Sequence, residues 1–96
     1  MLARELIQGG DFRKAIELFT QAIAKKPDFP IAYNGRGYAF MRLNEFKLAE
    51  ENYSLAIKYN PRYANAYKNR SAARAKLGDL AGSQQDLAMS RQLSSQ

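Results

Sequence analysis

The sequence predicts an all-α protein made of stacked helix pairs, and two observations support this fold class. The first is composition: the 96 residues include no valine, one threonine and five isoleucines, but fifteen alanines and ten leucines. Strands favour β-branched residues, whereas helices favour Ala and Leu. The second is an internal repeat, because residues 11–29 and 32–43 recur 34 positions later as residues 45–63 and 66–77. A repeat of this length is typical of stacked helix–turn–helix units.

Six helices follow from the spacing of the apolar residues and from the repeat. Their predicted ranges are 2–8, 12–25, 30–43, 46–59, 64–77 and 80–93. The packing face of the third helix recurs at near-helical spacing and consists of Tyr33, Gly37, Phe40 and Leu43. The fourth helix has a face of the same kind, made of Phe46, Ala49, Tyr53 and Ala56. The 34-residue offset extends the assignment to the last two helices.

The turns carry the residues that end one helix and start the next. The turns inside the helix pairs contain Gly10-Asp11, Asn44-Glu45 and Gly78-Asp79. Gly or Asn there suits the left-handed residue that ends a helix, and the following acid complements the positive end of the next helix. Pro27 and Pro61 then end the second helix of their units.

These features resemble the tetratricopeptide repeat family, whose pattern runs W-x2-L-G-x2-Y, then A-x3-F, then P. The second unit carries the pattern in Tyr33, Arg36, Gly37, Phe40, Ala49, Tyr53 and Pro61. The first unit retains Leu2, Ala3, Leu6, Ala15, Phe19 and Pro27. The third departs from it at Ser71, Arg74, Ser83, Leu87 and Ser95. The RNA-reading pentatricopeptide repeat has a similar period, but the closing prolines and the Ala/aromatic pattern favour the tetratricopeptide assignment.

The resemblance implies antiparallel helix pairs stacked as a right-handed α-solenoid of about two and a half units. Residues 1–96 would form a single domain. It would consist of a truncated first repeat at 1–29, a second repeat at 30–63 and a third at 64–96.

Enzymatic chemistry has little support in the sequence. The chain has no His and no Cys, which removes the usual general base, thiol nucleophile and soft metal ligands. It also lacks a glycine-rich phosphate loop. We therefore expect no catalytic residue, no cofactor and no metal. No run of residues is long and apolar enough to cross a membrane, so a cytoplasmic protein is the default expectation.

The resemblance also implies a function, because in this family the first helix of each unit lines a concave groove that holds a peptide or a partner helix. The candidate groove residues are Arg4, Asn34, Tyr38, Arg42, Asn65, Lys68, Asn69 and Lys76. Asn side chains can clamp a peptide backbone, and Lys and Arg can bind carboxylates. The net charge is +6, and no acid occurs from Phe29 to Asn44 or from Asn52 to Gly78. The expected partner is therefore a protein or peptide, of acidic character.

One subset of the family grips the C-terminal carboxylates of chaperones with two Lys, two Asn and one Arg. Position by position, the places available here hold Arg4, Gly35, Asn65 and Asn69, and none matches. A register shifted by one repeat recovers only Asn69, with Asn34 and Tyr38 where Lys and Asn are expected. The sequence therefore argues against a chaperone-tail clamp.

Arg36 and Arg70 replace an apolar residue of the family pattern in both units. We expect each to reach the second helix of its own unit, where Asn52 is available to Arg36 and Asp86 to Arg70. A recurring residue at a helix–helix seam indicates a structural role more often than a ligand contact.

Two alternatives remain open at this level. The net charge and the run of Arg and Lys on helix 64–77 would also suit a nucleic-acid-binding helical repeat. The other alternative is a self-associating structural unit, because repeat arrays usually carry polar caps at their ends and this sequence has apolar residues there. The apolar residues left at the two ends are Leu2, Leu6, Leu80, Leu87 and Leu93. The chain could equally be a piece of a longer protein.

Overall fold

The computed structural model describes residues 10–96. The helices in this part are α2 (Phe12–Lys25), α3 (Pro30–Arg42), α4 (Phe46–Tyr59), α5 (Ala64–Lys76) and α6 (Leu80–Ser94), and it contains no strand. The predicted all-α class is confirmed. The predicted bounds are met for α2 and α4, whereas α3 and α5 end one residue earlier than expected and α6 ends one residue later. The helix predicted at 2–8 lies outside the described residues.

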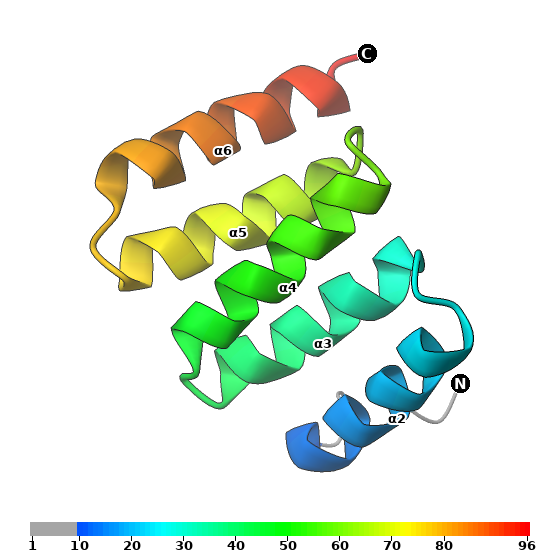
Figure 1. Ribbon diagram of the computed structural model, residues 1–96. Helices are drawn as coiled ribbons and strands as arrows, with labels where there is room; N and C mark the ends of the chain where they lie inside the picture. Colours follow the sequence, from blue (N-terminus) through cyan, green and yellow to red (C-terminus); the bar gives the residue numbers. More distant parts are fainter. Residues whose placement is uncertain (1–9) are drawn as a thin grey trace.

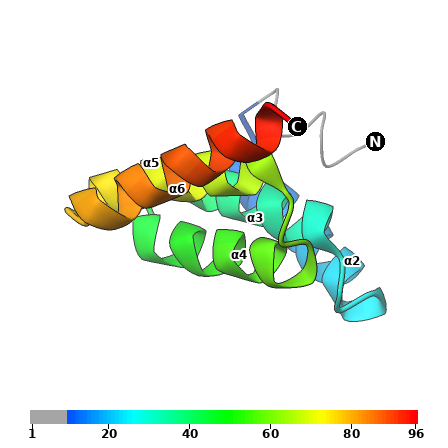
Figure 2. The same cartoon turned by 90° about the horizontal axis from the view of Figure 1, so that it is seen from above.

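The helices lie side by side in the order of the chain, from α2 at one end to α6 at the other (Figure 1). Each packs against the next, and α3 also touches α5. Seen from above, α4 lies on one side of α3 and α5 (Figure 2). The opposite sides of α3 and α5 are therefore not covered by α4.

The turns have the conformations that their residues predict. Gly10, Asn44 and Gly78 have φ values of +89°, +61° and +85°, in the left-handed region. Asp11 Oδ1 accepts a hydrogen bond from the Lys14 amide at 3.2 Å, and Asp79 Oδ1 accepts one from the Gly82 amide at 2.9 Å. These two acids therefore cap the helices that they precede.

The core is built mainly from alanines, which let the helices approach closely. The fully buried ones are Ala15, Ala32, Ala39, Ala49, Ala56, Ala66 and Ala73. Tyr53 is the one large side chain of residues 10–96 that is less than 2% exposed. A Cβ on Gly37 would lie 2.7 Å from the Tyr53 ring, so Gly37 is small because α4 comes close to α3 there. The turns between the helix pairs are also equivalent in the two repeats, because Tyr33 and Tyr67 donate hydrogen bonds to the carbonyls of Pro27 and Pro61.

The end of the array at α6 leaves apolar side chains near solvent. Leu80 is 64% exposed, and Leu87 and Leu93 are half-buried. Their use in self-association stays a prediction, and Leu2 and Leu6 lie outside the described residues. Within residues 10–96, no helix has both the length and the apolar character that a membrane crossing requires.

Candidate functional site

The structure assigns the two recurring arginines to the seams between helices. Arg36 donates from Nε to Asn52 Oδ1 at 2.7 Å and from Nη1 to Thr20 Oγ1 at 3.2 Å. Burial lowers the pKa of this guanidinium, although it has no acid to pair with in the described residues. The arginine therefore joins α3 to both α2 and α4, which confirms its predicted structural role.

Arg70 makes the same contacts one repeat later. Its Nε and Nη2 donate to the two carboxylate oxygens of Asp86 at 2.9 and 2.8 Å, and its Nη1 donates to Ser54 Oγ at 3.2 Å. Hydrogen bonding to Asp86 raises the pKa of Arg70. Because Thr20 and Ser54 also differ by 34 positions, the whole seam repeats with the sequence.

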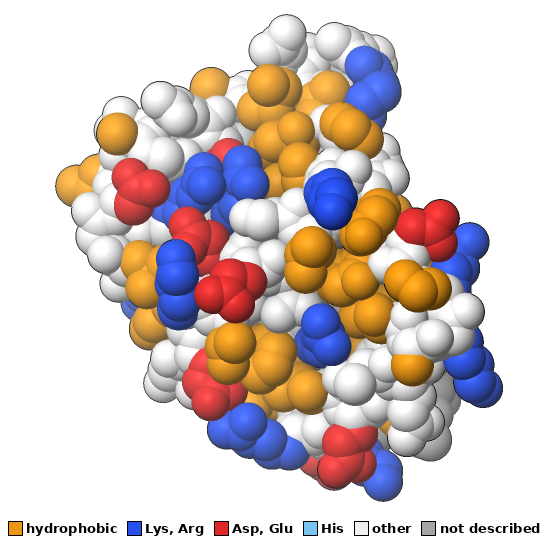
Figure 3. Space-filling view, viewed as in Figure 1, with side chains coloured by type: hydrophobic (Ala, Val, Ile, Leu, Met, Phe, Trp, Pro, Cys, Tyr) orange, Lys and Arg blue, Asp and Glu red, His pale blue; other side chains and the backbone are white. Residues whose placement is uncertain are grey.

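The second seam, where Arg70 on α5 contacts α4 and α6, carries a larger charge network. Arg74 donates from Nε to Glu50 Oε2 and from Nη1 to Asp86 Oδ2, both at 3.0 Å. Lys47 Nζ donates to Glu50 Oε1 at 2.9 Å. Figure 3 shows blue and red side chains gathered close together over the region of α4 and α5. Asp86 is only 3% exposed and holds two arginines at once.

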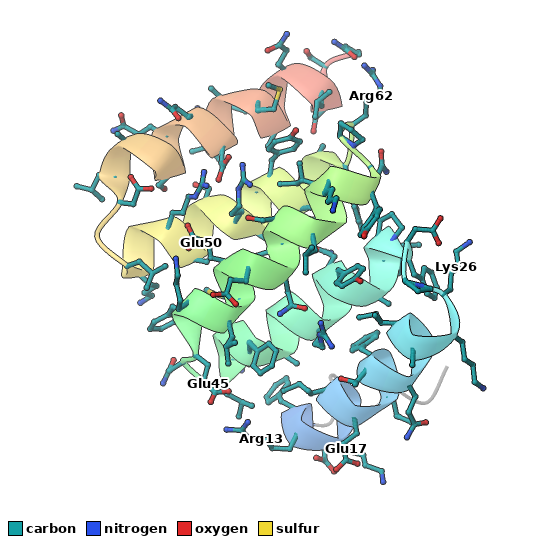
Figure 4. All side chains as sticks on the ribbon, viewed as in Figure 1. Arg13, Glu17, Lys26, Glu45, Glu50 and Arg62 are labelled. Atoms are coloured by element: carbon teal, nitrogen blue, oxygen red, sulfur yellow. The ribbon has the colours of Figure 1, made fainter. Side chains whose placement is uncertain are left out.

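A hollow of about 570 Å³ lies beside this network. Its lining residues are Lys47, Glu50, Glu51, Ser54, Leu55, Lys58 and Arg74. Figure 4 shows Glu50 on α4, in the region where α4 and α5 meet. Glu50 pairs with Lys47 within α4 and with Arg74 across to α5, so three of the charged residues that line the hollow already have partners. The hollow is therefore a weaker candidate for a ligand site than the exposed sides of α3 and α5.

Replacing Glu50 with glutamine should make the free energy of unfolding depend less on pH below neutral. The hydrogen bond from Lys47, followed by that from Arg74, lowers the pKa of Glu50 below its ordinary value of 4.5. A lowered folded-state pKa stabilises the protein above the unfolded value, and the stabilisation is lost as pH falls through the folded value. Urea unfolding should show Glu50→Gln about 1 kcal/mol less stable at neutral pH, with the difference shrinking on acidification.

Glu51→Gln provides the matched control, because Glu51 is exposed and has no ion pair within residues 10–96. It should lose little stability at neutral pH. A Glu50→Gln difference that stays constant between neutral and acidic pH would contradict the assignment.

The side of α3 turned away from α4 carries three exposed residues, Ile31, Tyr38 and Arg42, called the α3 strip below. Arg42 donates from Nη1 to the Tyr38 hydroxyl at 3.3 Å, and its guanidinium lies 5.2 Å from the Phe12 ring centroid. The structure thus brings the predicted groove residues Tyr38 and Arg42 together.

The corresponding side of α5 is the α5 strip, which consists of Asn65, Lys68, Ala72, Ala75 and Lys76. All five are exposed. The Lys76 ammonium lies 5.9 Å from the Phe46 ring centroid, which repeats the Arg42–Phe12 contact one unit later. No carboxylate of residues 10–96 lies within ion-pair distance of Arg42, Lys68 or Lys76.

Asn34 and Asn69, the other two asparagines among the candidate groove residues, meet between the strips. Asn69 donates from Nδ2 to Asn34 Oδ1 at 3.1 Å, and Asn34 donates from Nδ2 to the Tyr63 hydroxyl at 3.3 Å. Asn34 is only 9% exposed, so it forms part of the floor, whereas Asn69 is half-buried. Burial raises the pKa of Tyr63, and its hydroxyl stays protonated. The sequence pattern did not mark Tyr63, because the repeat-equivalent residue is Phe29, which has no hydroxyl.

Gly35 has a packing reason that the sequence does not show: a Cβ there would lie 2.7 Å from Phe19 Cε1, so the α2 ring occupies the space. Arg4, the remaining candidate groove residue, lies outside the described residues. Arg74, like Arg70, adds no free charge to the strips, because it pairs with Glu50 and Asp86.

Helices that pack in chain order, with repeat-equivalent seams and one uncovered side, define an α-helical repeat protein. A family model described as tetratricopeptide repeat matches residues 1–58 and 37–89, and the chain belongs to this family. No curated protein sequence matches the chain closely enough to count as a relative.

Solved structures of this family are similar to the chain over nearly its whole length. The first TPR domain of Spaghetti (RPAP3), bound to the HSP90 peptide SRMEEVD, is 30% identical with a TM-score of 0.93, over 95% of this chain and 72% of that one. The second TPR domain of human RPAP3, in complex with the HSP70 peptide SGPTIEEVD, is 26% identical with a TM-score of 0.91, over 95% and 76%. An Arabidopsis OM64 TPR domain is 26% identical with a TM-score of 0.94, over 98% and 78%.

Proposed function

We propose that the chain is a non-catalytic module that binds an acidic peptide or protein segment along the α3 and α5 strips. The main observation behind this proposal is the contrast between two sets of positively charged side chains. Arg70 and Arg74 are held by carboxylates in the seam, whereas Arg42, Lys68 and Lys76 stand exposed without an acid of the described residues beside them. Exposed cations of this kind can form charge-assisted hydrogen bonds with an incoming carboxylate.

The similar structures support this proposal. Two of them hold peptides that end in the acidic sequence EEVD. The fold and the acidic character of those ligands agree with the charge of the strips. The residues available here do not reproduce a chaperone-tail clamp, since Asn34 is buried and Tyr38 is aromatic. We therefore propose an acidic segment recognised by Lys68, Lys76 and Arg42, without a fixed C-terminal carboxylate.

Reversing the two exposed lysines of α5 should abolish most of this binding. Heptapeptides selected from a random displayed library against the wild-type protein should be enriched in Asp and Glu. The Lys68→Glu/Lys76→Glu variant should bind the tightest of them about tenfold or more weakly, because two attractive charges become repulsive. Isothermal titration calorimetry would measure the change.

A matched variant separates the local effect from that of net charge. Lys14→Glu/Lys25→Glu changes the net charge equally but lies on α2, and it should bind the same peptide nearly as well as the wild type. A library that gives no binder, or equal losses in the two variants, would contradict the proposal. Binding of single-stranded RNA with a steep salt dependence would favour the nucleic-acid alternative instead.

A further inference from the structure

We infer that Tyr63 is a positioning residue of this groove. Its hydroxyl holds the carboxamide of Asn34, and Asn34 in turn holds that of Asn69 for the main chain of an extended peptide. The inference rests on the proposed function and adds to it a point of main-chain recognition. Asn34 was expected from the sequence to contact the peptide itself. In this arrangement it instead supports a ligand contact that Asn69 makes.

The three residues come from different parts of the fold. Asn34 lies on α3, Tyr63 precedes α5 at its N-terminal end, and Asn69 lies one and a half turns into α5. Their two hydrogen bonds, at 3.1 and 3.3 Å, cross the place where α3 and α5 touch. Because burial increases from Asn69 to Asn34, this series of hydrogen bonds leads from the surface of the strips into the floor of the groove.

The hydroxyl is essential to this arrangement, whichever way the amides point. A phenol can accept from the Asn34 N–H groups or donate to its oxygen, so it holds the carboxamide in either orientation. A phenylalanine can do neither, and it would leave one end of Asn34 without a partner in a place that is 9% exposed.

Asn69 keeps groups free for a ligand. In the observed orientation one of its N–H groups is used by Asn34, while its Oδ1 has no hydrogen-bond partner within residues 10–96. One free acceptor and one free donor match the N–H and C=O of a peptide main chain. An anchored side chain also loses less rotamer freedom on binding than a free one, which favours affinity. The neighbouring Lys68 would then meet the peptide's acidic side chains.

Tyr63→Phe tests the inference, with Tyr67→Phe as the matched control. The Tyr67 hydroxyl also makes one hydrogen bond, to the Pro61 carbonyl at 2.9 Å, but it has no hydrogen bond to either asparagine. In the ligand-free protein, the side-chain amide NMR signals of Asn34 and Asn69 should shift in Tyr63→Phe and stay unchanged in Tyr67→Phe. Unchanged signals in Tyr63→Phe would overturn the inference.

Binding of the tightest selected heptapeptide gives the second readout. Tyr63→Phe should weaken it about threefold to tenfold, the size of one lost hydrogen bond. The double variant Tyr63→Phe/Asn69→Ala should bind no more weakly than Asn69→Ala alone, because Tyr63 acts through Asn69. Additive losses would overturn the inference. If the library gives no binder, the proposed function fails by itself, and the amide signals still decide whether Tyr63 holds the two asparagines.

Discussion

Replacing Asp86 with alanine should detach α6 from the rest of the domain, at a cost of about 3–5 kcal/mol. Asp86 is 3% exposed and accepts hydrogen bonds from both Arg70 and Arg74. The side chains of these arginines are only 16% and 22% exposed, so removing the carboxylate leaves two largely buried charges without their shared partner. Urea unfolding followed by circular dichroism would measure the loss, which is large beside the total stability of a small domain.

Asp86→Asn should cost less than Asp86→Ala, and the first seam shows why. There the equivalent residue is Asn52, whose Oδ1 accepts from Arg36 while its Nδ2 donates to the Leu48 carbonyl. An asparagine at 86 can therefore keep Arg70, although it would weaken the hold on Arg74. Glu17→Ala is the surface control, because the Lys14–Glu17 pair is exposed and such pairs contribute little. An Asp86→Ala loss no larger than that of Glu17→Ala would show that the network does not hold α6.

The helix pairs were predictable because the sequence states them twice. The 34-residue offset aligns the turns, the closing prolines and the alanine positions, so an ambiguous segment in one unit is settled by its copy in the other. The seam contacts of Arg36 and Arg70 followed from the same logic, since their partners Asn52 and Asp86 also repeat. The two arginines that recur at this offset therefore make equivalent contacts in the two units.

The candidate site was less predictable, because its details depend on residues that do not repeat. Helical spacing placed Tyr38, Lys68 and Lys76 on the exposed sides of their helices. It could not show that Asn34 is covered, because the cover comes from Tyr63 and Asn69, and Tyr63 has a phenylalanine as its repeat equivalent. The packing reason for Gly35 could not be predicted either, since the ring beside it belongs to Phe19 on another helix.

Replacing Gly37 with serine should destabilise the domain by about 1–3 kcal/mol, even though serine is the better helix former. A Cβ at this position would lie 2.7 Å from Tyr53 Cε1 and 2.8 Å from its Cδ1. The Tyr53 ring is 1% exposed and has no room to withdraw. The loss would appear as a lower urea midpoint. An unchanged midpoint would show that α3 and α4 can separate freely.

The next repeat shows how the same seam tolerates a serine. There Ser71 stands in place of Gly37 and Leu87 in place of Tyr53, and the Ser71 hydroxyl donates to the Ser83 carbonyl at 2.8 Å. Ser83 is the repeat equivalent of Ala49, whose carbonyl oxygen would lie 3.3 Å from a Cβ added to Gly37. The double variant Gly37→Ser/Tyr53→Leu should therefore be more stable than the sum of its single changes, by about 1–2 kcal/mol. A complete double-mutant cycle in urea would measure this coupling. A coupling near zero would mean that Gly37 and Tyr53 do not limit each other, and that the small residue at the seam has another cause.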